Sequence, residues 1–261
     1  MRLENDYFKM ILLRETISPH ISEETVEIEQ LTNFRELMLA YNAAIRAVTT
    51  KLEILNDELS HHDKKNPIQV IKSRVKEPAS IVRKLQKMDK DITTTAIVSS
   101  LNDVAGVRVV VAFIDDIYTV ADMLVKQDDV TLIDAKDYVK NPKSNGYRSY
   151  HMIIAVPIFF SDRKQSVKVE VQIRTVAMDF WASLEYQLKY KENLKDSNSI
   201  EIELKECAET IARTDLKMLE IKNKIEGNKL PRKKHRLYVI KDRTKKKKRN
   251  DTHNLQIHEM R

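Results

Sequence analysis

Glycine is scarce in this chain: Gly106, Gly146 and Gly227 are the only three among 261 residues. A P-loop and a Rossmann dinucleotide site each need at least two clustered glycines, so both kinds of site are excluded. Any phosphate that the protein binds must therefore be held by side chains. Cysteine is scarcer still, because the single Cys207 excludes an intramolecular disulfide.

The chain also lacks a long apolar run. No stretch approaches the roughly 18–20 consecutive apolar residues that a membrane helix needs. The first six residues, MRLEND, include acids where a secretory signal would have a basic region followed by an apolar one. Together with the single cysteine, these features predict a cytoplasmic location. With 42% hydrophobic residues, the chain can nevertheless bury a core.

The net charge of +7 comes from one segment. Residues 231–250 hold 11 of the 46 Lys and Arg but only 1 of the 39 Asp and Glu, so the rest of the chain is slightly acidic. Such a run predicts either a solvated tail or a weak contact with RNA or the ribosome. We therefore expect a basic, mobile tail over residues 228–261.

Two segments carry apolar residues at heptad spacing, which is typical of long amphipathic helices. In residues 34–60, with Asn33 as the predicted N-cap, they are Met38, Tyr41, Ile45, Val48, Leu52, Leu55 and Leu59. In residues 200–225, ahead of a stop at Gly227, they are Ile200, Leu204, Cys207, Ile211, Thr214, Met218, Ile221 and Ile225. Each stripe fits two interpretations, packing on the body of the protein or assembly of several copies. Cys207 is interpreted as a small core residue.

The central segment mixes strands and helices. The apolar run Val107–Phe113 predicts a buried strand, followed by a helix capped by Asp115 and a second strand over Val130–Tyr138. This order implies a parallel pair with a right-handed crossover. His151–Phe159 and Val167–Ile173 predict a hairpin, and a helix follows over residues 176–191, with Ala177, Phe180, Trp181, Leu184 and Leu188 on one face. The predicted fold class is α+β, with a mixed sheet of roughly five strands flanked by long N- and C-terminal helices.

Polar side chains alternate with apolar ones along the last predicted strand. Lys168, Glu170, Gln172 and Arg174 share one face. A solvated outer face is the simpler interpretation. A carboxylate, an amide and a guanidinium on one face would also suit a site for phosphate and a metal ion.

Three further clusters have similar chemistry. Around a helix that begins near Pro78 stand four phosphate-seeking residues, Arg74, Lys76, Ser80 and Lys84. Asp103 and Arg108 flank the entry to the first buried strand, and a strand-edge Asp with a strand-borne Glu is a usual Mg²⁺ ligand pair. Residues 141–151 combine a turn, cations and an aromatic ring able to stack on a base.

In this order the clusters resemble the synthetase domain of the RelA/SpoT family, in its short stand-alone form, the small alarmone synthetases. The matching stretches are SRVKEPASIVRKL (73–85), DVAGVRVVVAFIDDIY (103–118), KDYVKNPKSNGYRSYH (136–151) and VEVQIRTVAMDFWASLEYQLKY (169–190). The segments NPKSNGYRS and MDFWASLE are most similar to the RelP-type subgroup. The resemblance implies a nucleotidyltransferase-like synthetase domain over residues 66–192, preceded by a helical segment (1–65) and followed by a C-terminal helix (193–227) and the tail (228–261).

The resemblance also implies an activity. Members of the family are GTP diphosphokinases, which transfer pyrophosphate from ATP to the ribose 3′-hydroxyl of GDP or GTP and make the alarmones ppGpp and pppGpp for the stringent response. Small synthetases of this kind are homotetramers. Fewer than 75 residues precede Arg74, and the dipeptide His62-Asp63 lacks further metal ligands, so we expect synthesis without hydrolysis.

Residue roles follow from the matching motifs. Arg74, Lys76, Ser80 and Lys84 resemble contacts to the ATP phosphates, and Arg108 resembles the arginine that stacks on adenine. Asp103 and Glu170 resemble the Mg²⁺ ligands, with Glu170 also the base for the 3′-hydroxyl. The implied GDP/GTP contacts are Lys143, Asn145, Tyr147, His151, Gln172, Arg174 and Glu185.

The chain departs from the family pattern at two places, and two other functions stay open. It reads Leu184-Glu185-Tyr186 where many relatives read LEH, and YRSYH where YRSLH is usual. A related enzyme could pyrophosphorylate the 3′ end of tRNA, which the basic tail favours and the intact GYRS segment opposes. A non-enzymatic RNA- or ribosome-binding protein is the other alternative. The complete set of Asp103, Glu170 and Tyr147 counts against it.

Overall fold

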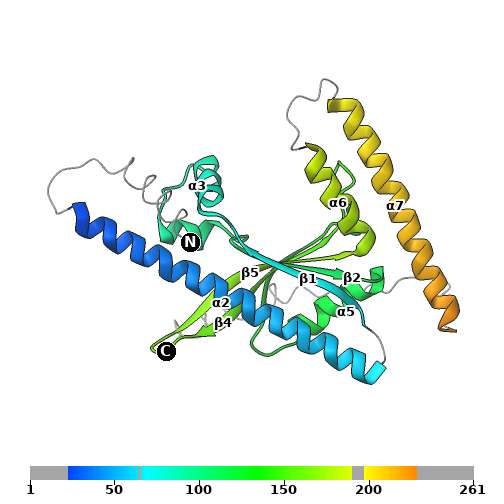
Figure 1. Ribbon diagram of the computed structural model, residues 1–261, viewed down its shortest axis with the longest axis horizontal. Helices are drawn as coiled ribbons and strands as arrows, with labels where there is room; N and C mark the ends of the chain where they lie inside the picture. The colour runs from blue at the N-terminus through cyan, green and yellow to red at the C-terminus, as the bar shows by residue number, and fades with distance from the viewer. Residues whose placement is uncertain (1–22, 64–65, 190–196, 228–261) are drawn as a thin grey trace, which may run out of the picture. The chain divides into compact units, whose positions relative to one another are not determined.

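The computed structural model describes residues 23–63, 66–189 and 197–227 (Figure 1). The tail predicted over 228–261 lies outside them. The elements in chain order are α2 (Glu23–Asp63), β1 (Ile68–Val75), α3 (Pro78–Lys87), α4 (Thr94–Ser100), β2 (Ala105–Val111), α5 (Ile114–Val125), β3 (Thr131–Asp137), β4 (Tyr150–Phe159), β5 (Lys164–Thr175), α6 (Val176–Lys189) and α7 (Ser197–Ile225). The chain divides after Leu219 into two compact units, and of the described residues only the end of α7 belongs to the second. None of the described helices is long and apolar enough to cross a membrane.

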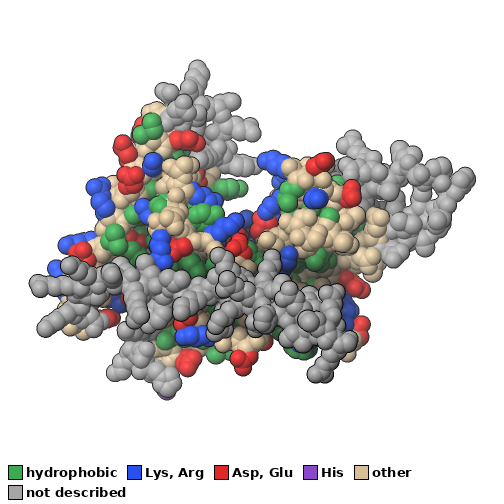
Figure 2. Space-filling view, turned by 180° about the vertical axis from the view of Figure 1, so that it is seen from behind, with side chains coloured by type: hydrophobic (Ala, Val, Ile, Leu, Met, Phe, Trp, Pro, Cys, Tyr) green, Lys and Arg blue, Asp and Glu red, His purple; other side chains and the backbone are tan. Residues whose placement is uncertain are grey.

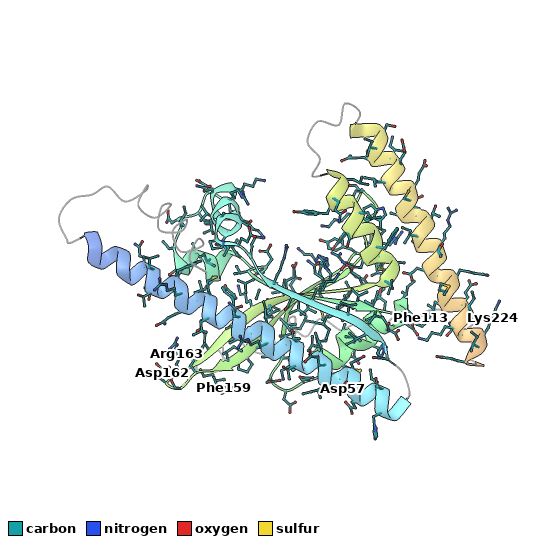
Figure 3. The ribbon with its side chains drawn as sticks, in the orientation of Figure 1. Asp57, Phe113, Phe159, Asp162, Arg163 and Lys224 are labelled. Carbon is teal, nitrogen blue, oxygen red and sulfur yellow. The ribbon has the colours of Figure 1, made fainter. Side chains whose placement is uncertain are left out.

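The predicted α+β class with a mixed five-stranded sheet is confirmed. The strand order is β1-β2-β5-β4-β3, and only the β2–β5 pair is parallel. The β4–β5 hairpin is also confirmed, with Asp162 and Arg163 at its turn, where Arg163 forms an ion pair with Glu36 of α2 (Figure 3).

The predicted β2–β3 pair is wrong. These strands run in the same direction, but β5 and β4 lie between them. The reason is burial. One whole face of β5 is apolar and buried, so β5 lies at the centre of the sheet, whereas β3 is largely exposed and lies at an edge. The other edge strand, β1, has no clear alternation and was not predicted as a strand.

The first heptad stripe belongs to the core. Tyr41, Ile45, Val48 and Leu52 are buried in the same cluster as the apolar face of β5, so α2 packs its stripe on the sheet with α5 beside it (Figure 1). The described part of α2 begins at Glu23, which makes the predicted N-cap at Asn33 wrong, because the preceding residues are good helix formers without a break.

Other predicted helix details also need correction. The N-cap of α5 is Phe113, and Asp115 lies in the first turn, where an acid stabilises the helix dipole. On α6, Met178 and Trp181 are buried, whereas Phe180, Leu184 and Leu188 are exposed. The Trp181 indole explains which face of α6 is buried, because its Nε1 donates a hydrogen bond to the Leu204 carbonyl of α7 at 2.8 Å.

Cys207 is exposed, so its interpretation as a core residue is wrong. The residues of α7 that are buried in the first unit are Ala208, Asp215 and Leu219. The helix is turned by one position from the predicted face because it must pass close to Gly146, and the small Ala208 fits there. Four residues on, Ala212 is half-buried on the same side.

Candidate active site

The strand register gathers the polar clusters on one face of the sheet. Paired residues of neighbouring strands point to the same face. Two such rows cross β1, β2 and β5, namely Arg74–Gly106–Glu170 and Lys72–Arg108–Gln172, and the second row continues to His151 on β4. The opposite face of the sheet is the core beneath α2 and α5, so this polar face lines a cleft.

The cleft lies between α3 and α6. Figure 2 shows it from behind as a hollow between two lobes, with basic and acidic side chains along its floor. Helix α3 begins at Pro78 as predicted, because proline fits the first helical position. The first turn of α3 follows directly from β1, which brings Lys76 and Lys84 to the same side of the cleft.

Asp103 is the acid on this side of the cleft. Its Oδ2 lies 2.8 Å from Lys76 Nζ and 2.7 Å from Lys84 Nζ. Burial alone would raise the pKa of Asp103, but the two lysines outweigh burial and hold the pKa below its ordinary value. Its other oxygen, Oδ1, is buried and has no hydrogen-bond partner among residues 23–63, 66–189 and 197–227. An ionised carboxylate with an unused oxygen is a suitable ligand for a hard cation.

Glu170 provides a second ionised carboxylate. Burial would raise its pKa, yet contacts with His151 and Gln172 lower it overall. His151 Nδ1 lies 3.4 Å from Glu170 Oε1, and Gln172 Nε2 donates to Oε2 at 2.9 Å. The charge of Asp103 opposes this lowering, so the two carboxylates are close enough to repel each other.

A metal ion in this cleft would need ligands from Asp103, from Glu170 and from a bound substrate. The described residues contain no group of three or more His, Cys, Asp and Glu placed to hold one. Asp103 and Glu170 together fit a Mg²⁺ ion that takes its remaining oxygens from phosphates and water.

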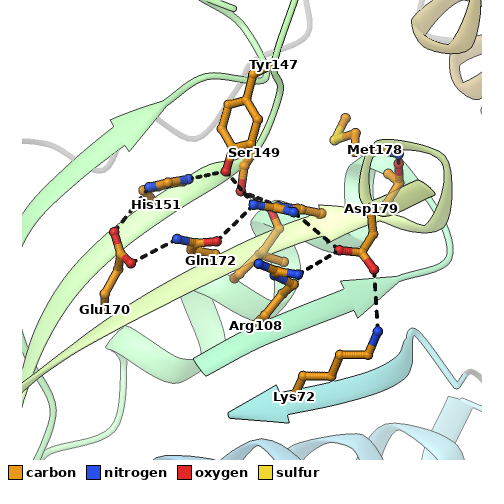
Figure 4. Close-up of polar contacts among 12 residues, drawn as sticks. Lys72, Arg108, Tyr147, Ser149, His151, Glu170, Gln172, Met178 and Asp179 are labelled. Atoms are coloured by element: carbon orange, nitrogen blue, oxygen red, sulfur yellow. Dashed lines mark hydrogen bonds and ion pairs between the residues drawn. The ribbon is translucent and has the colours of Figure 1, made fainter. Parts of the chain in front are cut away.

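Tyr147 lies on the far side of Glu170, in a cluster of rings and cations (Figure 4). Its hydroxyl is 2.8 Å from His151 Nε2 and accepts a hydrogen bond from Arg174 Nη2 at 2.5 Å. Lys143 Nζ lies 4.8 Å from the centre of its ring. An aromatic face with cations around it can bind a base together with its phosphates.

The loop that carries Tyr147 is held by two helices. Asn145 donates to Glu185 of α6 at 3.1 Å. Gly146 has a φ of 87° and packs against Ala208 of α7. The loop is therefore fixed at neighbouring positions, which sets the direction of the Tyr147 ring.

The structure brings most of the predicted residues together, but not all. Arg74 is exposed on the edge strand β1. The Ser80 hydroxyl accepts a hydrogen bond from Arg83 at 3.0 Å. Both residues line the α3 side of the cleft without joining the hydrogen-bonded centre.

Asp179 was missed by the sequence prediction. This acid lies in the first turn of α6, 3.3 Å from Arg174 Nη1, 3.5 Å from Arg108 Nη1 and 3.9 Å from Lys72 Nζ (Figure 4). It is inside a matching stretch, but nothing in its spacing indicates that the β5–α6 junction turns it back over the sheet.

Comparisons with known proteins show which family the sequence belongs to. Residues 73–195 match the region found in RelA/SpoT proteins. The GTP pyrophosphokinase YwaC of Bacillus subtilis (strain 168) is 42% identical over 196 residues, which cover 75% of this chain and 93% of that protein.

Solved structures are similar as well. The small alarmone synthetase 1 of Bacillus subtilis bound to its product pppGpp is 33% identical, with a TM-score of 0.67 over 74% of this chain and 97% of that one. The same synthetase bound to AMPCPP is 29% identical, with a TM-score of 0.62 over 75% and 98% of the two chains.

Proposed function

This chain belongs to the RelA/SpoT family of GTP pyrophosphokinases, and we propose that its cleft transfers pyrophosphate from ATP to the ribose 3′-hydroxyl of GDP or GTP, which yields ppGpp or pppGpp. The observation that carries this function is the position of Glu170. An ionised carboxylate lies between a basic cluster suited to a triphosphate and an aromatic cluster suited to a base.

The donor nucleotide binds on the α3 side. Lys76 and Lys84 neutralise the phosphates of ATP, and Arg74 and Ser80 extend this surface along β1 and α3. Arg108 stacks on the adenine. Side chains do this work because the chain has no glycine-rich loop. The similar synthetase bound to AMPCPP, an ATP analogue, supports a donor site in this fold.

The acceptor nucleotide binds on the Tyr147 side. The guanine stacks on Tyr147, whose ring is oriented by His151 and Arg174. Lys143 contacts the acceptor phosphates, and the buried Arg174 and its partner Gln172 support the acceptor beside Glu170. Asn145 and Glu185, joined to each other, define the edge of the base pocket.

Transfer requires one proton acceptor and strong neutralisation of charge. Glu170 takes the proton of the ribose 3′-hydroxyl. The hydroxyl oxygen at the same time forms a bond to the β-phosphorus of ATP. The bond from that phosphorus to the oxygen of the α-phosphate breaks, and AMP leaves. Lys76 and Lys84 stabilise the negative charge that develops on the transferring and leaving groups. When bound by Asp103 and Glu170, Mg²⁺ would supply further charge neutralisation and hold the phosphates in line.

Assembly of several copies is part of this proposal. Val176, Phe180, Leu184 and Leu188 recur every four residues on α6 and are all exposed, which makes one apolar face suited to a second copy. We propose a cytoplasmic homotetramer in which residues 66–192 form the synthetase domain. The basic tail adds at most a weak RNA or ribosome contact.

One incubation tests the function. Purified protein is supplied with ATP labelled on the β-phosphate and with GDP, GTP or bulk tRNA, and the products are separated. We expect label in ppGpp or pppGpp with release of AMP, and no label in tRNA. Label in tRNA alone would replace the proposed acceptor, and no transfer to any acceptor would leave the non-enzymatic alternative.

A further inference from the structure

Asp179 is shared by two arginines that come from neighbouring strands. Arg108 of β2 and Arg174 of β5 both contact its Oδ1, at 3.5 and 3.3 Å. The side chains of Asp179 and Arg174 are only 13% and 5% exposed, whereas that of Arg108 is 34% exposed. The acid therefore lies beneath the cleft surface and joins a buried cation to one that reaches the cleft.

The two arginines would repel each other without this acid. Burial and the charge of Arg174 both lower the pKa of Arg108, and the Asp179 carboxylate opposes this lowering. Arg174 is enclosed, so loss of the shared carboxylate would displace Arg108 toward the open cleft. Arg174 would also lose one of the contacts that fix its guanidinium.

Each arginine orients a different part of the cleft. Arg174 Nη2 donates both to the Tyr147 hydroxyl at 2.5 Å and to Gln172 Oε1 at 2.9 Å (Figure 4). Arg108 lies in the row between Lys72 and Gln172, on the donor side. One carboxylate thus fixes two arginines, one from each of two neighbouring strands.

We propose that Asp179 is a positioning residue common to both nucleotide sites: it acts through Arg108 on the donor and through Arg174 and Tyr147 on the acceptor. This inference rests on the proposed function, which assigns those arginines to the two nucleotides. Asp179 takes no part in the chemistry itself. Removal of its charge therefore weakens the binding of both substrates together. Removal of a group that contacts one substrate would weaken the binding of that substrate alone.

The test compares Asp179→Asn with wild type by isothermal titration, using α,β-methylene-ATP and GDP in separate experiments. Charge-assisted hydrogen bonds are about twice as strong as neutral ones, so we expect both Kd values to rise by roughly five- to tenfold. The matched control is Asp162→Asn, which removes an acid–arginine pair at the exposed hairpin turn (Figure 3) and should leave both Kd values unchanged.

Asp179→Glu gives a second reading, and it serves as the main test should Asp179→Asn fail to fold. It keeps the charge but displaces it by one methylene, so both Kd values should rise together and less than in Asp179→Asn. A rise in only one Kd, or unchanged Kd values with a lower unfolding temperature, would overturn the proposal. Wild-type protein that binds neither nucleotide would overturn the proposed function itself, and the wild-type titrations reveal this before any variant is compared.

Discussion

Gly146 and Ala208 touch across the boundary between the Tyr147 loop and α7. A Cβ built on Gly146 would lie 2.6 Å from the Ala208 Cβ, a distance that real side chains do not tolerate. The φ of 87° at Gly146 also belongs to a region that other residues rarely adopt. The C-terminal helix therefore fixes the loop that presents Tyr147, in addition to any role in assembly.

Gly146→Ala should weaken binding of the acceptor nucleotide and leave binding of the donor nucleotide nearly unchanged. The substitution adds backbone strain on the order of 1–3 kcal/mol and a contact that must push the loop off α7. We expect the Kd for GDP to rise by about tenfold, equivalent to about 1.4 kcal/mol, and the Kd for α,β-methylene-ATP to stay within about twofold.

Two variants separate strain from contact. Gly227 also has a positive φ, but none of the residues that the structure describes lies within 4 Å of the added Cβ, so Gly227→Ala tests strain without the contact to Ala208 and should leave GDP binding unchanged. Adding Ala208→Gly to Gly146→Ala removes the atom that the new methyl would meet and should restore part of the affinity. Normal GDP binding by Gly146→Ala would mean that α7 does not position this loop.

Glu170→Gln should abolish transfer and leave the fold intact. The amide is nearly isosteric and still accepts from Gln172, but it cannot take a proton, and loss of a general base typically costs about 10²–10⁴-fold in rate. Turnover and thermal unfolding are measured together. The control is Lys168→Gln, on the same face of β5 but bonded to Asn102 and Val98. A Glu170→Gln enzyme with more than a tenth of wild-type turnover would remove Glu170 from the mechanism.

Tyr147→Ala and Arg74→Ala should have opposite effects. Stacking of a base on an aromatic ring contributes roughly 1–3 kcal/mol to binding. Tyr147→Ala should therefore weaken GDP binding and leave binding of the ATP analogue unchanged. Arg74→Ala should do the reverse. Tyr147→Phe keeps the ring and loses only the hydroxyl contacts to His151 and Arg174, so its effect should be smaller. Equal weakening of the ATP analogue by both alanine variants would contradict the division of the cleft.

Much of this cleft could be predicted because strand geometry is local. Alternation along β5 fixes which side chains share a face, so Glu170, Gln172 and Arg174 were placed together from the sequence. Pro78 at the start of α3 is similar, since one residue determines the helix start. In each case the conformation follows from the segment itself.

The remaining features depend on contacts between distant segments. Which of Cys207 and Ala208 is buried depends on the close approach of α7 to Gly146, and both residues suit an apolar stripe. Asp179 meets Arg108 across 71 residues of sequence, through the order of β2 and β5 in the sheet. The stripe of α2 fitted a core and an oligomer equally until the sheet beneath it was known.

The exposed face of α6 should control assembly. We expect light scattering to give a mass near four times 30.5 kDa for the wild type. Phe180→Ser with Leu184→Ser makes this face polar and should reduce the mass. Ile54→Ser, at a residue of α2 that is as exposed as Phe180, is the control and should not. A wild-type monomer at micromolar concentration would contradict the proposed tetramer.

Asp215 should make stability fall as the pH rises. Burial raises the pKa of this acid, and the hydrogen bond from Thr175 Oγ1, at 2.5 Å, offsets only part of the rise. The folded protein thus holds the proton more tightly than the unfolded chain. Stability from this group is greatest below the ordinary Asp pKa of 3.8 and is lost as the pH rises through the higher folded value.

Asp215→Asn isolates the contribution of Asp215 to the pH dependence of stability. Asparagine does not titrate, and all other titratable groups are the same in the wild type and the variant. Urea unfolding of both proteins is measured across the acid range to neutral pH. The free energy of unfolding of the wild type, relative to the variant, should decline through that window and then level off. Thr175→Val removes the hydrogen bond that lowers the pKa of Asp215, so in that background the decline should extend to higher pH. A difference that does not change with pH would show that burial does not shift the titration of Asp215.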